Sequence, residues 1–213
     1  WMHAGAVRVD NEKMSKSLGN FFTIREILDR YHPEVVRYFL ISSHYRSAIN
    51  YSEDNLVIAK QNLERFYHAL KGLEVAAAIP YAALDKNDNY VQRFDAAMAD
   101  DFNAPVALAV LYDLVRDLNN AKEAANHDRA SYLALTLKSL AGILGILQLS
   151  ADAFLQSGSG DQMAAEDIEA MMAERVQAKK DRQFGRADEI RNALKAQGVI
   201  LEDSREGTTW RRE

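Results

Sequence analysis

Apolar side chains recur at helical spacing through the middle of this 213-residue chain, and this periodicity limits its possible folds more than any other feature. Over residues 53–71, 89–99, 105–126 and 129–148 they return every three or four positions. A helix with such a stripe must bury it against a neighbouring element. Four stripes in succession therefore predict a helical bundle. The residues of these stripes are Leu56, Ala59, Leu63, Phe66, Tyr67, Leu70, Tyr90, Phe94, Met98, Val106, Val110, Leu114, Leu118, Leu133, Leu137, Leu140, Leu144 and Leu147.

The segment before the bundle has a mixed pattern. We expect, in order, a strand with a turn, a polar loop, two short helices and an irregular stretch. These correspond to residues 1–9, 10–20, 23–31, the helix that begins at Pro33, and 42–52. Ser52 is a suitable N-cap for the long helix that follows, and Gly72 a suitable stop. The apolar residues expected to be buried by the two short helices are Ile24, Ile27, Leu28, Val36, Phe39 and Leu40.

The segment after the bundle changes character. Residues 157–162 are rich in Gly and Ser, which is the composition of a flexible linker. The last 50 or so residues form a small module with a helical pair and a strand pair. Its expected elements are helices at 164–180 and 184–197, Gly198 as a C-cap, and strands at 199–201 and 208–210 around a Glu206-Gly207 turn.

The composition excludes some classes of protein. It is 48% hydrophobic and 27% charged, as in ordinary globular proteins, and no run of about 18 apolar residues predicts a membrane span. No leader for export is recognisable, and the absence of Cys fits a cytosolic protein. The net charge of −5 is concentrated in residues 73–162, whereas residues 1–72 carry 10 basic and 8 acidic side chains. Local basic patches for nucleic acid are therefore compatible with the overall acidity.

One short motif carries chemistry. Lys13-Met14-Ser15-Lys16-Ser17, followed by Leu18-Gly19-Asn20, places two lysines on a polar loop between a strand and a helix. Lys is a compact cation that suits phosphate groups. When the carboxylate of an amino acid attacks the α-phosphorus of ATP, negative charge develops on the departing pyrophosphate. A closing loop that brings Lys to this charge stabilises the transition state in particular.

This motif is similar to the second signature of class I aminoacyl-tRNA synthetases. Further stretches, in the same order along the whole chain, resemble the cysteinyl-tRNA synthetases within that class. These stretches are Trp1-Met2-His3-Ala4-Gly5, Lys16–Phe22, Val36–Leu40, His44–Ser47, Asn50–Ser52, Asp100–Pro105, Leu201–Asp203 and Gly207–Arg212. Because the chain opens with Trp1 inside this pattern, we expect it to be the C-terminal piece of a longer protein.

The resemblance implies a mainly α fold in three parts joined by a linker. Residues 1–52 would be the end of the catalytic domain, with the lysine loop and an α/β stem-contact region. Residues 53–156 would be the helical tRNA-binding bundle, 157–162 the linker, and 163–213 a small α+β anticodon-binding module. The implied function is ATP-dependent attachment of cysteine to tRNA(Cys), with the separated piece itself inactive.

The resemblance also assigns residues and partners. Lys16 would contact ATP, with Lys13 as a supporting catalytic residue, and the anticodon would be contacted by Lys179, Phe184, Asp188 and Asp203. The family pattern favours Arg and Trp where this chain has Lys179 and Phe184. The implied partners are tRNA(Cys), cysteine and ATP with Mg, for a cytoplasmic monomer. A zinc ion is implied for the full-length enzyme but not for this chain, which has no Cys and five unclustered His.

Two alternatives remain open at this level. One is an amino-sugar cysteine ligase, which would share the first 20 residues but should lack the module at 163–213. The other is a non-catalytic RNA-binding module.

Overall fold

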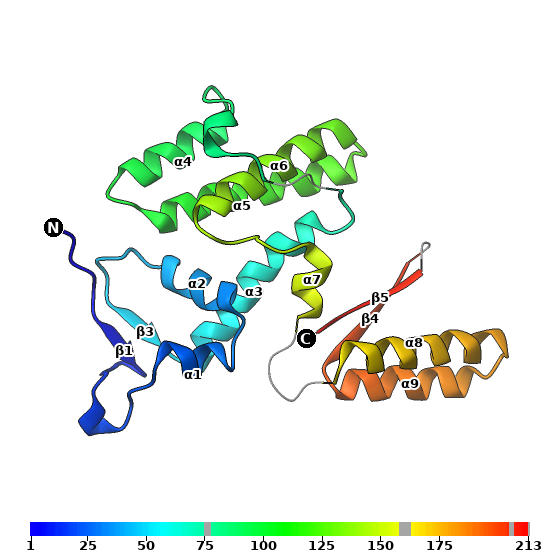
Figure 1. The fold of residues 1–213 in the computed structure, drawn as a ribbon. Helices are drawn as coiled ribbons and strands as arrows, with labels where there is room; N and C mark the ends of the chain where they lie inside the picture. Colours follow the sequence, from blue (N-terminus) through cyan, green and yellow to red (C-terminus); the bar gives the residue numbers. More distant parts are fainter. Residues whose placement is uncertain (75–77, 158–162, 205–206, 213) are drawn as a thin grey trace. The chain divides into compact units, whose positions relative to one another are not determined.

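The computed structural model describes residues 1–74, 78–157, 163–204 and 207–212. The chain forms two compact units, Trp1–Ala151 and Asp152–Glu213, which are described separately below (Figure 1). Five of the six residues expected to form the linker, 158–162, lie outside the described ranges, as does Glu206 of the expected turn. No helix in the described ranges is long and apolar enough to cross a membrane.

The first unit opens with a small three-stranded sheet in the order β2-β1-β3. Asp10 and Asn11, both at positive φ, turn the chain from β1 into antiparallel β2, as a tight hairpin requires. β3 pairs in parallel with β1, with Tyr51 opposite Val9. The expectation of a loop at 10–20 and of an irregular stretch at 42–52 was therefore incomplete, because strands of two or three residues leave no periodic signal. The strands are β1 (Val7–Val9), β2 (Glu12–Lys13) and β3 (Ile49–Tyr51).

Two short helices, α1 (Ile24–Leu28) and α2 (Pro33–Ile41), lie between these strands in sequence. Helix α1 is shorter than expected, and of its predicted apolar face only Ile27 is buried. Helix α2 buries Val35 and Tyr38 together with the expected Phe39, whereas Leu40 is exposed.

Glu34 is a buried carboxylate on α2 that accepts three hydrogen bonds. Its donors are the backbone N–H groups of Leu147 and Gln148, each at 3.0 Å, and the hydroxyl of Tyr67 at 2.7 Å. A buried charge needs such partners, since it has lost its water. These bonds attach the end of the bundle to the segment that follows the lysine loop.

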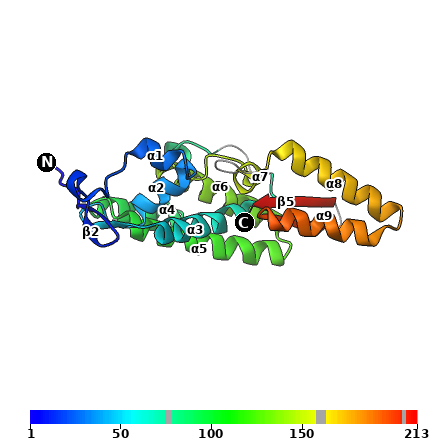
Figure 2. The ribbon, with the colours of Figure 1, turned by 90° about the horizontal axis from the view of Figure 1, so that it is seen from below.

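The predicted bundle is confirmed. Helix α5 packs against α3, α4 and α6 (Figures 1 and 2). Ser52 caps α3 by accepting from the N–H of Asn55 at 3.2 Å, and Gly72 ends it at positive φ. Helix α6 ends five residues earlier than expected because Gly145 and Leu147 adopt positive φ. The helices are α3 (Glu53–Leu70), α4 (Asn89–Ala99), α5 (Ala104–Glu123) and α6 (His127–Ile143).

The second unit packs a helical pair against a two-stranded antiparallel sheet, as the sequence predicts. Its strands are longer than expected, and helix α7 was not predicted. The core consists of Ile168, Ile190, Leu194, Val199 and Trp210. The elements are α7 (Ala151–Gln156), α8 (Ala165–Lys180), α9 (Phe184–Ala196), β4 (Val199–Ser204) and β5 (Gly207–Arg212).

Arg212, at the end of β5, binds two stretches of backbone that lie on either side of residues 157–162. Its Nε donates to the carbonyl of Gln156 at 3.1 Å, and its Nη2 to the carbonyl of Met163 at 2.7 Å. The side chain is buried, and this burial lowers the pKa of its guanidinium. Gln156 in turn donates from Nε2 to the carbonyl of Trp210 at 3.4 Å.

Candidate functional site

The lysine loop follows the hairpin of β1 and β2 and is held in shape by Asn20. The side-chain oxygen of Asn20 accepts from the N–H of Ser15 at 2.9 Å, and its Nδ2 donates to the carbonyl of Lys13 at 3.2 Å. Ser15 caps a single turn of 3₁₀-helix at Lys16–Leu18, which ends at Gly19 with φ 67°. The loop is therefore a defined turn in which Lys16 is the first helical residue.

Both lysine side chains of this loop are exposed. Within the described ranges, neither ammonium has a carboxylate partner, and the Lys16 Nζ lies 5.4 Å from the centre of the Phe21 ring. Phe21 is itself about half exposed. Two cations without counter-charges on a preformed turn are suited to binding phosphate groups.

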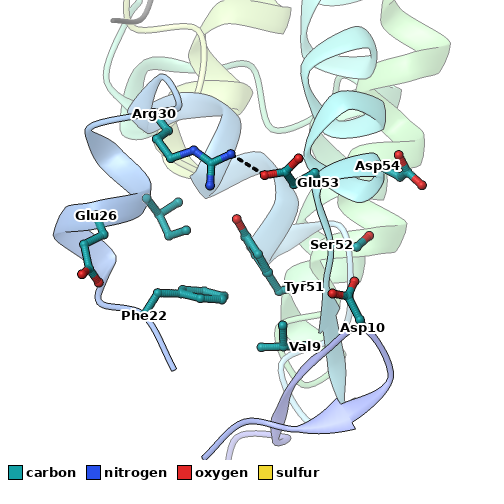
Figure 3. Close-up of a pocket in the computed structure, with 10 residues that line it drawn as sticks. Val9, Asp10, Phe22, Glu26, Arg30, Tyr51, Ser52, Glu53 and Asp54 are labelled. Atoms are coloured by element: carbon teal, nitrogen blue, oxygen red, sulfur yellow. Dashed lines mark hydrogen bonds and ion pairs between the residues drawn. The ribbon is translucent and has the colours of Figure 1, made fainter. Parts of the chain in front are cut away.

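A cavity of about 450 Å³ lies beside α1 and the start of α3 (Figure 3). Arg30 points toward Glu53 and forms an ion pair with it, while the rings of Phe22 and Tyr51 are in contact, with centres 4.3 Å apart and planes tilted by 52°. Four carboxylates line the cavity, but only one cation does, Arg30, which is already paired with Glu53. A polyphosphate would be repelled here, so the exposed loop is the better candidate for contact with ATP. The four carboxylates are those of Asp10, Glu26, Glu53 and Asp54.

The second unit places the four predicted anticodon residues around its helical hairpin. Lys179 lies in the last turn of α8, and Phe184 begins α9 with 63% of its surface exposed. Asp188 follows one turn later on α9 and is exposed. In the described part of the chain its carboxylate accepts no hydrogen bond, so its acceptor sites are available. Asp203 lies on β4.

Asp203 is engaged by three side chains. Arg175 binds it with two prongs, at 3.1 and 2.9 Å, Thr208 donates from its hydroxyl at 2.6 Å, and the Lys179 Nζ lies 3.4 Å away. The hydrogen bonds from Arg175 and then Thr208 hold the pKa of this carboxyl well below its usual range. The structure thus brings Lys179 and Asp203 together directly.

Arg175, which the sequence analysis did not single out, is the centre of this arrangement. Its side chain is buried, and its pKa is raised mainly by Asp203 and to a smaller extent by the charge of Asp188. The signal was present in the sequence, because Arg175 continues the apolar stripe of Ile168 and Met171 on α8. A charged residue on a buried stripe needs a partner, which here is Asp203.

No group of three His, Cys, Asp or Glu side chains in the described ranges is arranged to hold a metal ion. We therefore assign no metal-ligand role to these residues.

Three family models match successive parts of the chain. The first, "tRNA synthetases class I (C) catalytic domain", matches residues 1–61. A "DALR domain" matches residues 93–148, and a "Cysteinyl-tRNA ligase anticodon binding domain" matches residues 162–211. The lysine loop thus falls in the first region and the Arg175–Asp203 group in the last.

Curated relatives align over 211 residues, which is 99% of this chain and 44% of each relative. They are cysteine–tRNA ligases from Stutzerimonas stutzeri (strain A1501), at 58% identity, from Azotobacter vinelandii (strain DJ), at 57%, and from Ectopseudomonas mendocina (strain ymp), at 56%. The chain therefore spans less than half the length of these relatives.

Among solved structures, a LeuRS from Agrobacterium radiobacter K84, in a ternary complex with tRNA and LeuAMS, matches 67% of this chain and 20% of its own. Its TM-score of 0.46 and sequence identity of 21% are too low to support an argument. The successive family models and the curated relatives agree with one another, and on their strength the chain belongs to the cysteinyl-tRNA synthetase family, as its C-terminal portion.

Proposed function

We propose that this chain is part of an enzyme that uses ATP to attach cysteine to tRNA(Cys), to which it contributes the ATP-contacting loop and the RNA-binding surfaces. The observation that carries the proposal is the turn of Lys13–Asn20, with two exposed ammonium groups that have no carboxylate partner among the described residues. The family models and the relatives support the same reading. Mg²⁺ would arrive with ATP as part of the substrate, and the enzyme would be a cytoplasmic monomer.

Lys16 acts in the first chemical step. A carboxylate oxygen of cysteine attacks the α-phosphorus of ATP, and the bond from that phosphorus to the bridging oxygen breaks to release pyrophosphate. The carboxylate is already the nucleophile, so no base is required. Lys16 neutralises the charge that develops on pyrophosphate, and Lys13 adds to the same field. Asn20 keeps the turn in the shape that presents Lys16.

The second unit reads the anticodon. Phe184 offers an exposed ring on which an unpaired base can stack. Asp188, an acceptor with available lone pairs, selects a base that offers N–H donors. Lys179 supplies a cation for a phosphate or a base oxygen, and Asp203 holds it in place. Because Lys cannot form the two-pronged contact of Arg, its part in base selection is smaller.

A domain division follows from the proposed roles. Residues 1–52 would carry the end of the catalytic domain and the stem-contact region, 53–156 the bundle, and 163–213 the anticodon module. Zinc, if the complete enzyme uses it, would be bound by residues other than those described here.

The test is pyrophosphate exchange by the complete enzyme. Lys16→Ala should slow cysteine-dependent ATP–pyrophosphate exchange by about 10²–10³, the usual effect of losing one charge contact in the transition state. Its affinity for tRNA should stay unchanged. Lys60→Ala removes a lysine charge from the half-buried side chain on α3, where it pairs with Glu64, and serves as the control. A normal exchange rate in Lys16→Ala would refute the assigned role.

The alternative of an amino-sugar cysteine ligase is not favoured, because the anticodon-binding family model matches residues 162–211. A direct comparison of products separates the two: the proposed enzyme forms cysteinyl-tRNA, whereas the alternative forms an amide with an amino sugar.

A further inference from the structure

Two cavities meet on the first unit, between α2, α3 and α5. Their volumes are about 490 and 330 Å³, and they share Tyr38, Ser42 and Asn62 as lining residues. They therefore form one continuous depression, which we call the α2–α3–α5 groove. None of its lining residues belongs to the lysine loop or to the Arg175–Asp203 group.

The groove is lined by a single charged residue. Its lining residues include one cation, Arg65, and no Asp or Glu. Arg65 is exposed, and among the described residues it forms no ion pair. On this unit Arg93 and Arg116 are neutralised by aspartates, whereas Arg65 lines the groove without an acidic neighbour among the lining residues. A cation left without a partner in a depression is available to an anion.

The remaining polar groups of the groove are neutral and rich in donors. The half-buried amide of Asn62 forms no hydrogen bond in the described part of the chain. Asn55 donates to the carbonyl of Asn50 at 2.9 Å, and its side-chain oxygen stays available to accept. These groups can bond to the phosphate oxygens and ribose hydroxyls of a nucleic acid.

Tyr38 and Tyr112 add one further donor. Their hydroxyl oxygens lie 2.6 Å apart, across α2 and α5. This bond uses one of the two hydroxyl hydrogens, so the pair keeps one O–H to donate. Burial, together with the bond to Tyr112, raises the pKa of Tyr38, which therefore stays protonated at neutral pH.

We propose that the α2–α3–α5 groove binds a phosphodiester of the tRNA backbone, with Arg65 as its cation and Asn62 and the tyrosine pair as donors. A phosphodiester carries one negative charge, which a single Arg matches. The amides along the groove suit the ribose hydroxyls on either side. The inference rests on the proposed function, since it assumes that the chain binds tRNA.

The experiment measures binding of a labelled tRNA(Cys) transcript to the 213-residue chain at several salt concentrations. Arg65→Gln should weaken binding by about tenfold, the scale of one charge-assisted hydrogen bond. It should also lower the slope of log affinity against log salt by about one, as the loss of one phosphate contact does. Asn62→Leu, which fills the groove without changing charge, should weaken binding and leave the slope unchanged.

Lys60→Gln is the control for loss of net charge, because Lys60 lies on the same helix, is not a lining residue of the groove and pairs with Glu64. Lys179→Ala, in the second unit, is a positive control for RNA contact. If the unvaried chain fails to bind tRNA, the proposed function fails and takes this inference with it. If the chain binds and Lys179→Ala weakens binding, yet both groove variants bind like the unvaried chain, only the groove inference is overturned. Displacement of the tRNA by millimolar inorganic phosphate at constant ionic strength would also overturn it, since the groove would then be a site for free phosphate.

Discussion

Asp188 and Asp203 are two carboxylates of the second unit with different capacities for binding. Asp203 already accepts from Arg175 and Thr208 and lies beside Lys179. Asp188 has no hydrogen-bonded partner among the described residues. Asp203 is thus suited to order the site, and Asp188 to accept from an incoming base.

Replacing Asp203 should affect stability as well as recognition. Asp203→Asn leaves the buried guanidinium of Arg175 without its counter-charge, and we expect the second unit to lose about 1–2 kcal/mol at pH 7. The lower part of the usual range applies because half of the Asp203 side chain is exposed. Denaturant unfolding followed by the fluorescence of buried Trp210, in a Trp1→Phe background, measures this loss. Asp188→Asn is the control and should cost much less, because Asp188 has no hydrogen bond to Arg175 and only its charge acts on that guanidinium.

The stability difference should depend on pH in one direction. An unfolded aspartate titrates at about pH 4, and Asp203 in the folded chain titrates lower. The carboxylate therefore contributes stability above about pH 4, which is lost as the pH falls through its lowered pKa. The gap between the unvaried chain and Asp203→Asn should accordingly narrow in strong acid. A gap that stays constant from pH 7 to pH 2 would contradict this assignment.

Recognition provides a test for Asp188. In the complete enzyme, Asp188→Ala should cost about 1–3 kcal/mol in kcat/KM for cognate tRNA, the scale of one base contact. It should also reduce discrimination against tRNA with a substituted anticodon. Full cognate preference in this variant would mean that Asp188 is an ordinary surface residue.

The resemblance supplied residues that periodicity alone does not distinguish. Lys179, Phe184 and Asp188 lie on exposed helix surfaces, where any polar or aromatic residue is tolerated. Lys16 stands in a recognisable motif with its own chemistry, so it could be found from the sequence. Arg175 could have been found as a charge on a buried stripe.

At the level of elements, the long helices were predictable and the short pairings were not. Helices α3, α4, α8 and α9 begin and end within about a residue of their expected bounds, because each has a full apolar stripe and most have a recognisable start or stop. The parallel pairing of β1 with β3 depends on contacts across more than 40 residues, which no local pattern encodes. The early end of α6 depends on backbone conformations at Gly145 and Leu147.

Glu34 provides a prediction at this scale, since it joins α2 to the backbone beyond α6. Glu34→Ala removes the acceptor for two buried N–H groups and for the Tyr67 hydroxyl, so the first unit should lose about 2–4 kcal/mol. Glu34→Gln keeps an acceptor oxygen and should lose less. Thermal unfolding followed by circular dichroism measures both variants. Glu123→Ala, which replaces an exposed residue near the end of α5, is the control. Equal stability of Glu34→Ala and the unvaried chain would show that this bond set contributes little.

Across the whole molecule, acidic and basic side chains are unevenly distributed along the chain. The net charge is −5, yet the proposed RNA contacts include the cations Arg65 and Lys179, and the proposed contact with ATP is the cation Lys16. RNA held at a few points requires local cations and no overall basic charge. Composition alone therefore understates what the chain can bind.

The hydrogen bonds of Arg212 determine what an insertion at residues 157–162 does to the second unit. Because one guanidinium holds Gln156 and Met163 to the same strand, extra residues between them enlarge a closed loop and do not lengthen a tether.

Three residues inserted at 157–162 should leave kcat/KM for tRNA(Cys) within about twofold. The same insertion between Leu149 and Ser150, next to the junction of the two units, alters the span between Lys16 and Phe184 and should lower it about tenfold or more. Equal losses from both insertions would mean that the Gly- and Ser-rich segment sets the reach of the enzyme along its tRNA.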